Sequence, residues 1–222
     1  MKGIILIHGF GGSPYEMRPI GEYMKKYGFS PVYPLLPGHR ENALTLGKYR
    51  MEEWIDYLQH LIHEKIKEYD STSICGLSMG ASLSIIIASE FEFEKLILLA
   101  PPIYIRKSGF NLIPYIGFIN IPIKIANSSP NPESYLSVPL PAVYQFWRTI
   151  HKSVEAIEKI NSPTLIIQGL SDPTVKPEGA RFIFNRLRAK KILIFVEGGN
   201  HMLTFGKTAK AVKFLIKDFL NG

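Results

Sequence analysis

Residues 71–88 read STSICGLSMGASLSIIIA, and Ser78 stands within this stretch between Gly76 and Gly80. The short, partly β-branched run before Gly76 predicts a buried strand, and the small and aliphatic residues after Gly80 predict a packed helix. A serine between glycines at a strand-to-helix corner is a nucleophile elbow, in which a strained backbone lifts the hydroxyl clear of the sheet. The stretch therefore predicts a nucleophilic serine at a helix N-terminus, where the helix dipole favours developing negative charge.

The meaning of the elbow depends on whether a base and an acid follow it, because this short pattern also arises by chance. A serine hydroxyl needs a base to become a nucleophile, and the base needs an orienting acid. Two aspartates follow Ser78, Asp172 and Asp218, and a single histidine, His201, follows Asp172. Asp172 and His201 each come directly after a predicted strand, whereas Asp218 lies among lysines of the last predicted helix. Ser78, Asp172 and His201 thus occur in the chain order that elbow enzymes use.

Four further segments complete the pattern: HGFGGSP at residues 8–14, LPGH at 36–39, GLSDPTV at 169–175 and GNH at 199–201. With them the chain resembles the α/β-hydrolase superfamily over nearly its whole length, and in particular its small carboxylesterases and monoacylglycerol lipases. The resemblance implies that Ser78 is the nucleophile, His201 the general base and then acid, and Asp172 the residue that orients His201. It also implies an oxyanion hole made by the backbone N–H groups of Phe10 and Met79.

The glycine-rich loop after the first predicted strand has a rival interpretation as a phosphate-binding loop. It lacks the G-K-[ST] ending of a P-loop and the spacing of a dinucleotide fingerprint, so we favour the oxyanion loop. His8 and His39 are expected to brace their loops by hydrogen bonds. Arg40 departs from the family pattern, which often has glycine there, so that loop is expected to differ in shape or to carry a surface charge.

Alternating strands and helices predict an α/β fold with a mostly parallel sheet covered by helices on both faces. The chain begins at the strand before the oxyanion loop, where larger family members have two more strands, so we expect a reduced sheet of about six strands. The SPYE segment at residues 13–16 predicts a helix running to about Tyr27, and apolar spacing predicts another over Met51–Tyr69. The strands are expected near residues 3–8, 30–34, 72–76, 95–100, 163–168 and 191–196.

The alternation breaks between Ala100 and Pro163, a segment that holds eight of the sixteen prolines. Prolines at this density exclude a continuous helix or a central strand. By the resemblance we expect a cap over residues 101–162, inserted in a core domain of residues 1–100 and 163–222. The cap is expected to contain short helices within 103–118 and 133–150. The alternative is that the segment is a loop-rich extension of the core. The aromatic and aliphatic residues of the segment predict an apolar acyl pocket or an exposed interfacial patch. The expected substrate-binding residues are Phe10, Ile103, Tyr104, Phe146 and Trp147.

A net charge of +7 raises the possibility of nucleic-acid binding. The cations are dispersed over predicted helix faces and helix ends without interleaved aromatic residues, so we expect no nucleic-acid partner. No stretch is long enough to span a membrane, and the opening apolar run is too short for a signal peptide. A single cysteine, Cys75, expected to be a buried hydrophobe, excludes a disulfide framework and favours the cytoplasm. The usage of Ile, Lys and Glu resembles that of thermophiles.

Together these features predict a serine hydrolase that forms an acyl-enzyme on Ser78 and uses neither a metal nor an organic cofactor. The apolar cap favours short- to medium-chain acyl esters or monoacylglycerols as the small-molecule substrate. Thioesters, amides and peptides remain open because the same triad cleaves them. A ligand-binding protein without turnover is an alternative from another class, since a fold does not fix a function. The sequence makes no prediction of the oligomeric state.

Overall fold

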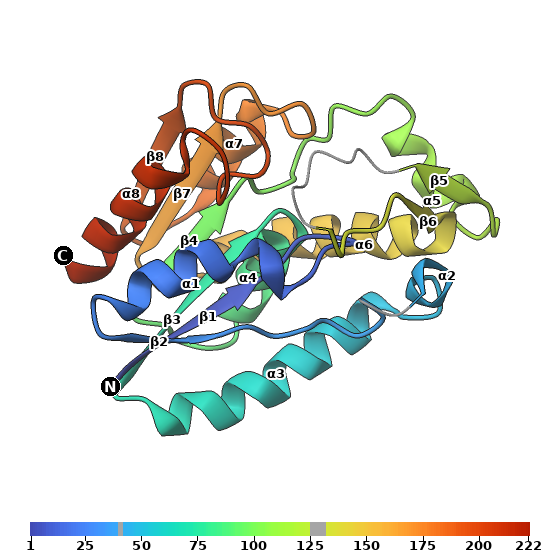
Figure 1. The fold of residues 1–222 in the computed structure, drawn as a ribbon. Helices are drawn as coiled ribbons and strands as arrows, with labels where there is room; N and C mark the ends of the chain where they lie inside the picture. The colour runs from blue at the N-terminus through green and yellow to red at the C-terminus, as the bar shows by residue number, and fades with distance from the viewer. Residues whose placement is uncertain (40–41, 125–131) are drawn as a thin grey trace.

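The computed structural model describes residues 1–39, 42–124 and 132–222. The expectation for Arg40, and residues 125–131 of the predicted cap, lie outside the described residues. The main sheet has six parallel strands in the spatial order β2-β1-β3-β4-β7-β8 (Figure 1). These strands are β1 Lys2–Ile7, β2 Phe29–Val32, β3 Ser71–Leu77, β4 Leu96–Leu99, β7 Thr164–Gly169 and β8 Lys191–Val196. All six predicted strands are therefore confirmed, each within two residues at either end.

Strands β1 and β4 are apolar along most of their length because helices cover both faces of the sheet. In β1 the side chains of Ile5 and Ile7 pack into one hydrophobic cluster, and those of Ile4 and Leu6 into the other. On the first face lie α3 Met51–Glu68, α4 Met79–Ala88, α6 Leu140–Ala156 and α7 Pro177–Arg186. On the second face lie α1 Arg18–Lys25 and α8 Ala209–Asn221. Cys75 on β3 is fully buried, as predicted.

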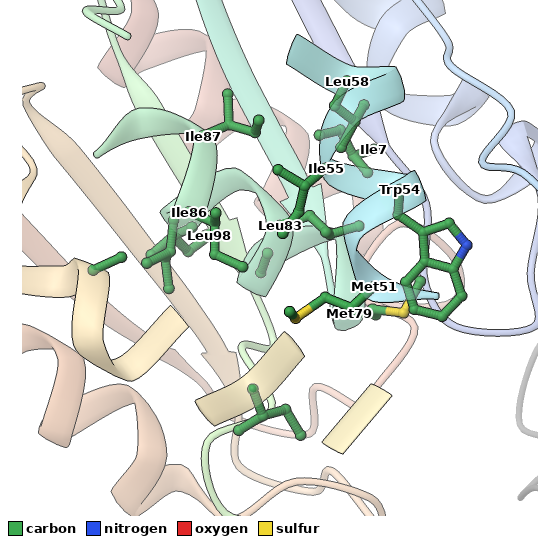
Figure 2. Close-up of a cluster of buried hydrophobic side chains, with 14 of the residues drawn as sticks. Ile7, Met51, Trp54, Ile55, Leu58, Met79, Leu83, Ile86, Ile87 and Leu98 are labelled. Carbon is green, nitrogen blue, oxygen red and sulfur yellow. The ribbon is translucent and has the colours of Figure 1, made fainter. Parts of the chain in front are cut away.

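The larger cluster joins α3 and α4 to the sheet, as Figure 2 shows. Trp54 and Leu58 of α3 and Leu83 of α4 are fully buried in this cluster, to which β1 contributes Ile7. The α4 helix is buried on all sides, so it forms a layer between the sheet and the outer helices α3 and α6. This burial fixes the helix that starts directly after Ser78.

The helix predicted from residue 14 to Tyr27 is divided in the structure. A 3-10 turn spans Pro14–Glu16, and α1 then runs over Arg18–Lys25. Pro19 lies in the first turn of α1, where its missing N–H is tolerated, but its ring would clash with a helical carbonyl four residues earlier. One continuous helix through this proline is therefore unfavourable. The other predicted helix is confirmed as α3.

The segment predicted as a cap has two parts. Its first part contains a 3-10 turn at Phe110–Leu112, the short helix α5 Ile113–Ile116, and an antiparallel hairpin of β5 Pro122–Lys124 with β6 Ser137–Pro139. These elements gather at one end of the molecule, where β6 packs on α2 Ala43–Leu46 (Figure 1). The second part is α6 and a 3-10 turn at Ile157–Lys159, and α6 packs on α4 within the core cluster. Of the helices that the structure describes, none combines the length and apolar character needed to cross a membrane.

Candidate active site

The elbow has the strained backbone that the sequence predicts. Ser78 follows β3 directly and has φ 54° and ψ −120°, an unfavourable conformation for a residue with a side chain. Its N–H donates to the carbonyl of Leu99 on β4, at 2.9 Å. The neighbouring strand therefore holds the corner in place, and Ser78 comes out at the C-terminal edge of the sheet, where open α/β sheets place ligands.

The two glycines of the elbow are required by close backbone contacts. A Cβ atom on Gly76 would lie 2.1 Å from the carbonyl oxygen of Gly80. A Cβ atom on Gly80 would lie 2.3 Å from the carbonyl oxygen of Ile7 on β1. Both contacts involve backbone atoms, which cannot rotate away as a side chain can. The two glycines of the G-x-S-x-G pattern are thus needed so that a helix can start in close contact with the ends of two strands.

We expect Gly80→Ala to lower the free energy of unfolding by about 3 kcal/mol or more, because the added methyl group overpacks a rigid backbone site. Urea unfolding followed by circular dichroism measures this change. The matched control is Gly28→Ala, at φ 83° with no atom near its missing Cβ. That variant is expected to lose only about 1 kcal/mol, from backbone strain. Equal losses in the two variants would contradict the role of close contact at Gly80.

The three residues selected from the sequence meet at this edge of the sheet. His201 Nε2 lies 3.0 Å from Ser78 Oγ, and His201 Nδ1 lies 2.8 Å from Asp172 Oδ2. Ser78 is 8% exposed and Asp172 2%, so only the His201 side of the chain of hydrogen bonds is open to solvent. His201 is thus within hydrogen-bond reach of both Ser78 and Asp172, the geometry that a serine nucleophile, its base and an orienting acid require.

Asp172 is held as a carboxylate by several donors. Its Oδ1 accepts the N–H groups of Thr174 and Val175 at 2.7 and 2.9 Å, and its Oδ2 accepts Gln168 Nε2 at 3.2 Å. Burial by itself raises the pKa of Asp172, but the hydrogen bond and charge of His201, with the two backbone N–H groups, outweigh it and hold the pKa below its usual value. The carboxylate therefore fixes the orientation of His201 with Nε2 towards Ser78. Gln168 was not identified from the sequence as a partner of Asp172, because it lies at the end of an apolar strand segment and belongs to no motif.

The loop predicted to supply an oxyanion donor lies against Ser78. A Cβ atom on Gly9 would be 3.5 Å from Ser78 Cβ, and Phe10 lines the same cavity as Ser78. Within the described residues, the N–H groups of Phe10 and Met79 have no hydrogen-bond acceptor in the protein. Two backbone donors are therefore available beside Ser78, as an oxyanion hole requires.

His8 and His39 stabilise this loop and its neighbour by hydrogen bonds, as predicted. His8 Nε2 accepts the N–H of Leu36, and His39 Nε2 accepts the N–H of Gly11, both at 3.2 Å. Each ring therefore carries its proton on Nδ1, which faces the carbonyl of Gly9 in His8 and that of Pro37 in His39. Burial lowers the pKa of His39 to about 4. Burial and the adjacent His39 lower the pKa of His8 well below its usual value.

We expect the free energy of unfolding to fall as the pH decreases from about 6.5, the usual pKa of an unfolded histidine, towards 4. His39 binds its proton more readily in the unfolded chain, so its contribution is complete above the unfolded pKa and is lost as the pH falls through the folded value. A pKa lowered to about 4 corresponds to about 3 kcal/mol. Urea unfolding at pH 7.5, 6 and 5 measures the slope, which His39→Gln should flatten. An unchanged slope in that variant would contradict the assignment.

Two features of the oxyanion loop were not identified from the sequence. The sequence assigns Glu16 to a helix start. In the structure its buried carboxylate accepts the N–H of Gly9 at 2.9 Å. The N–H of Tyr135, in the predicted cap, donates to the carbonyl of Gly11 at 2.9 Å. Nearby, Ser13 Oγ donates to Glu133 Oε2 at 2.5 Å. The loop is therefore tied to the segment that precedes β6, a long-range contact for which local sequence carries no signal.

A mostly apolar cavity of about 510 Å³ opens beside Ser78 and His201. Phe10 and Phe146, two of the residues expected to bind substrate, line it and stack with ring centroids 5.0 Å apart. The other apolar side chains along its wall are Leu77, Ile105, Phe110, Ile123, Val143, Pro173 and Met202. The cavity has the size and lining of a small-molecule site for an apolar group.

The other predicted pocket residues lie elsewhere. Ile103, Tyr104 and Trp147 line a second cavity of about 480 Å³, and among the described residues it shares Ile105 and Phe110 with the first. Trp147 follows Phe146 on α6, and successive residues of a helix point about 100° apart, so both side chains cannot face one pocket. Of the five residues expected to bind substrate, two therefore line the cavity beside Ser78 and three line the second cavity.

Comparison with known proteins identifies the family to which the chain belongs. The model of the alpha/beta hydrolase family matches residues 4–212. The chain belongs to that family. Among the relatives of this hydrolase, a carboxylesterase of Bacillus subtilis (strain 168) is 23% identical over 229 residues, covering 99% of this chain and 92% of the relative. A thermostable monoacylglycerol lipase of Bacillus sp. (strain H-257) is 24% identical over 210 residues, covering 91% of this chain and 83% of that protein.

Solved structures share the fold of this hydrolase. A structure from work on two metagenome-derived lipolytic enzymes, LipS and LipT, matches with a TM-score of 0.92 at 20% identity, covering 99% of this chain and 93% of that one. The monoacylglycerol lipase of Paleococcus ferrophilus matches with a TM-score of 0.83 at 18% identity, covering 98% and 93%. Likeness at this level of identity supports the alpha/beta-hydrolase fold.

Proposed function

We propose that the protein is a serine hydrolase that cleaves carboxylic esters through an acyl-enzyme on Ser78. The observation that carries the proposal is the continuous set of hydrogen bonds from Ser78 through His201 to Asp172, beside an apolar cavity. Relatives named carboxylesterase and monoacylglycerol lipase support it. Short- to medium-chain acyl esters and monoacylglycerols are the proposed substrates.

In the proposed mechanism Ser78 Oγ attacks the ester carbonyl while His201 Nε2 takes the serine proton. Asp172 stabilises the imidazolium that forms and keeps its orientation. The oxyanion of the tetrahedral intermediate accepts the N–H groups of Phe10 and Met79, and one such donor is worth roughly 3–4 kcal/mol of barrier. His201 then protonates the leaving alcohol. Water, activated by His201, cleaves the acyl-enzyme and restores Ser78.

The apolar cavity supports an aliphatic acyl group as the part of the substrate that binds there. Phe10, Val143 and Phe146 would contact the acyl chain. Burying methylene groups stabilises binding by about 0.8 kcal/mol each. We propose that residues 101–124 and 132–139 form the part of the expected cap that covers the site, because α6 packs with the core.

The test is hydrolysis of p-nitrophenyl esters from acetate to palmitate, with mass spectrometry of enzyme quenched during turnover. We expect activity with a maximum at short to medium chains, and an acyl adduct on the peptide that contains Ser78. Parallel assays with a thioester and an aminoacyl amide determine whether the enzyme prefers ester, thioester or amide bonds. A folded protein that hydrolyses none of the esters would contradict the proposal and would favour the ligand-binding alternative.

A further inference from the structure

Three cations surround the opening of the active-site cavity. Arg106, Lys107 and Lys124 all line it, and all three are exposed to solvent. The sequence from residue 101 to 132 contains no aspartate or glutamate. The acidic residue that lines the cavity within the described part of the chain, Glu16, is buried against the N–H of Gly9 on the oxyanion loop. We call Arg106, Lys107 and Lys124 the cationic rim.

The rim carries its charge without compensation by acidic side chains. In the part of the chain that the structure describes, none of the three cations makes an ion pair, and their polar contacts are with backbone carbonyls. Lys107 Nζ donates to the carbonyl of Lys124 at 2.9 Å, so these two residues of the rim are neighbours. Three arginines elsewhere on the surface are paired, Arg148 with Glu52 and both Arg186 and Arg188 with Glu158. The positive potential at the opening is therefore available to a ligand.

An apolar interior with a cationic opening fits an amphiphilic anion. An acyl chain that occupies the apolar side of the cavity leaves the alcohol part of the ester towards the opening. Lysine and arginine bind phosphate and carboxylate through charge-assisted hydrogen bonds. A local positive field also raises the encounter rate of anionic substrates. A neutral ester would use none of these interactions.

We propose that the enzyme selects esters whose alcohol part carries an anionic group, a phosphate or a carboxylate, which the cationic rim binds. The inference rests on the proposed ester hydrolysis at Ser78. The reaction is the hydrolysis already described: water is consumed, the acyl–oxygen bond breaks, and the products are a carboxylic acid and the anionic alcohol. Because contacts between exposed charges are individually weak, we expect about two- to fivefold in kcat/KM from each rim cation and about tenfold or more from the set.

The first experiment compares two substrates that differ in one charge, 5-butanoyloxy-2-nitrobenzoate and its methyl ester, at low ionic strength. The wild type is expected to have a kcat/KM about tenfold higher for the anion. The double variant Lys107→Gln with Lys124→Gln should lose most of this preference, measured as the ratio of kcat/KM for the anion to kcat/KM for the methyl ester. Added salt should weaken the preference of the wild type, since it screens exposed charges.

The matched control is Lys207→Gln with Lys210→Gln, which removes the same charge from exposed positions outside the cavity lining. This variant should keep the full preference for the anion. Equal rates on both substrates, or equal losses on both in the rim variant, would overturn the proposal. Failure of the wild type on both esters would instead contradict the proposed function itself, so the two failures are distinguishable.

A second experiment separates the sources of the anion. The substrates are 1-decanoylglycerol, 1-decanoylglycerol 3-phosphate and decanoyloxyacetate, each below its micellar concentration. A preference for the phosphate or for the carboxylate over the neutral ester, lost in the rim variant, supports the proposal and names the group. Binding to phosphatidylglycerol vesicles that depends on the rim, without preference among the dissolved esters, would overturn it in favour of a membrane contact.

Discussion

Replacing Ser78 with alanine is expected to lower kcat for ester hydrolysis about a millionfold, because nucleophile and base act as one unit. Without Oγ, His201 has no proton to accept and no acyl-enzyme forms. The two backbone donors and the apolar cavity remain, so KM is expected to change little. Only a residual rate above the uncatalysed reaction, from oxyanion stabilisation and binding, should persist.

The free energy of unfolding should change little in Ser78→Ala. The strained φ of 54° is retained with alanine, and the lost hydrogen bond to His201 is partly exposed. Circular dichroism and urea unfolding check this point, so that a loss of activity can be assigned to chemistry. Labelling by a fluorophosphonate should disappear together with the activity.

The matched control is Ser82→Ala, the same substitution one turn along α4. Its hydroxyl is buried and has no hydrogen-bond partner in the described part of the chain. Removal of an unpaired buried polar group is neutral or stabilising, so activity and stability should both persist. A Ser78→Ala variant that keeps the rate of the wild type would contradict the assignment of the nucleophile.

The parts of the fold that sequence predicted are those with a strong local pattern. Strands β1 and β4 are apolar runs because both of their faces are buried, and each predicted strand boundary lies within two residues of the observed one. The site was predicted for a related reason. Ser78, Asp172 and His201 each follow a strand of one parallel sheet, and the carboxyl ends of such strands meet at one edge. Chain order and sheet topology together brought distant residues to one place.

The parts that sequence did not predict depend on long-range contacts or on side-chain direction. The hairpin of β5 and β6 contains prolines at Pro122 and Pro139, a composition that argues against strands, and its pairing depends on segments far apart in the chain. Glu16 fits a helix start by spacing, yet its carboxylate binds Gly9. The cationic rim brings Lys124 next to Lys107 although the two are far apart in the chain, and only the folded chain brings them together.

Asp172→Asn is expected to lower kcat about ten-thousandfold while leaving the fold intact, through a change of tautomer in His201. The Oδ1 position accepts two backbone N–H groups, from Thr174 and Val175, so the amide oxygen of asparagine must occupy it. The amide NH₂ then faces His201 Nδ1. Two donors cannot share a hydrogen bond, and His201 must therefore move its proton from Nδ1 to Nε2.

A proton on His201 Nε2 makes that nitrogen a donor to Ser78 Oγ, where catalysis needs an acceptor. Serine labelling by a fluorophosphonate should slow in parallel with kcat, and the strongly deshielded Nδ1–H proton should be absent from the NMR spectrum. Asp218→Asn on α8 provides the matched control and should keep full activity. A variant with intact kcat and the Nδ1–H signal lost would contradict the role of Asp172. Slow turnover with the Nδ1–H signal retained would place its effect in charge stabilisation of the imidazolium instead of the tautomer.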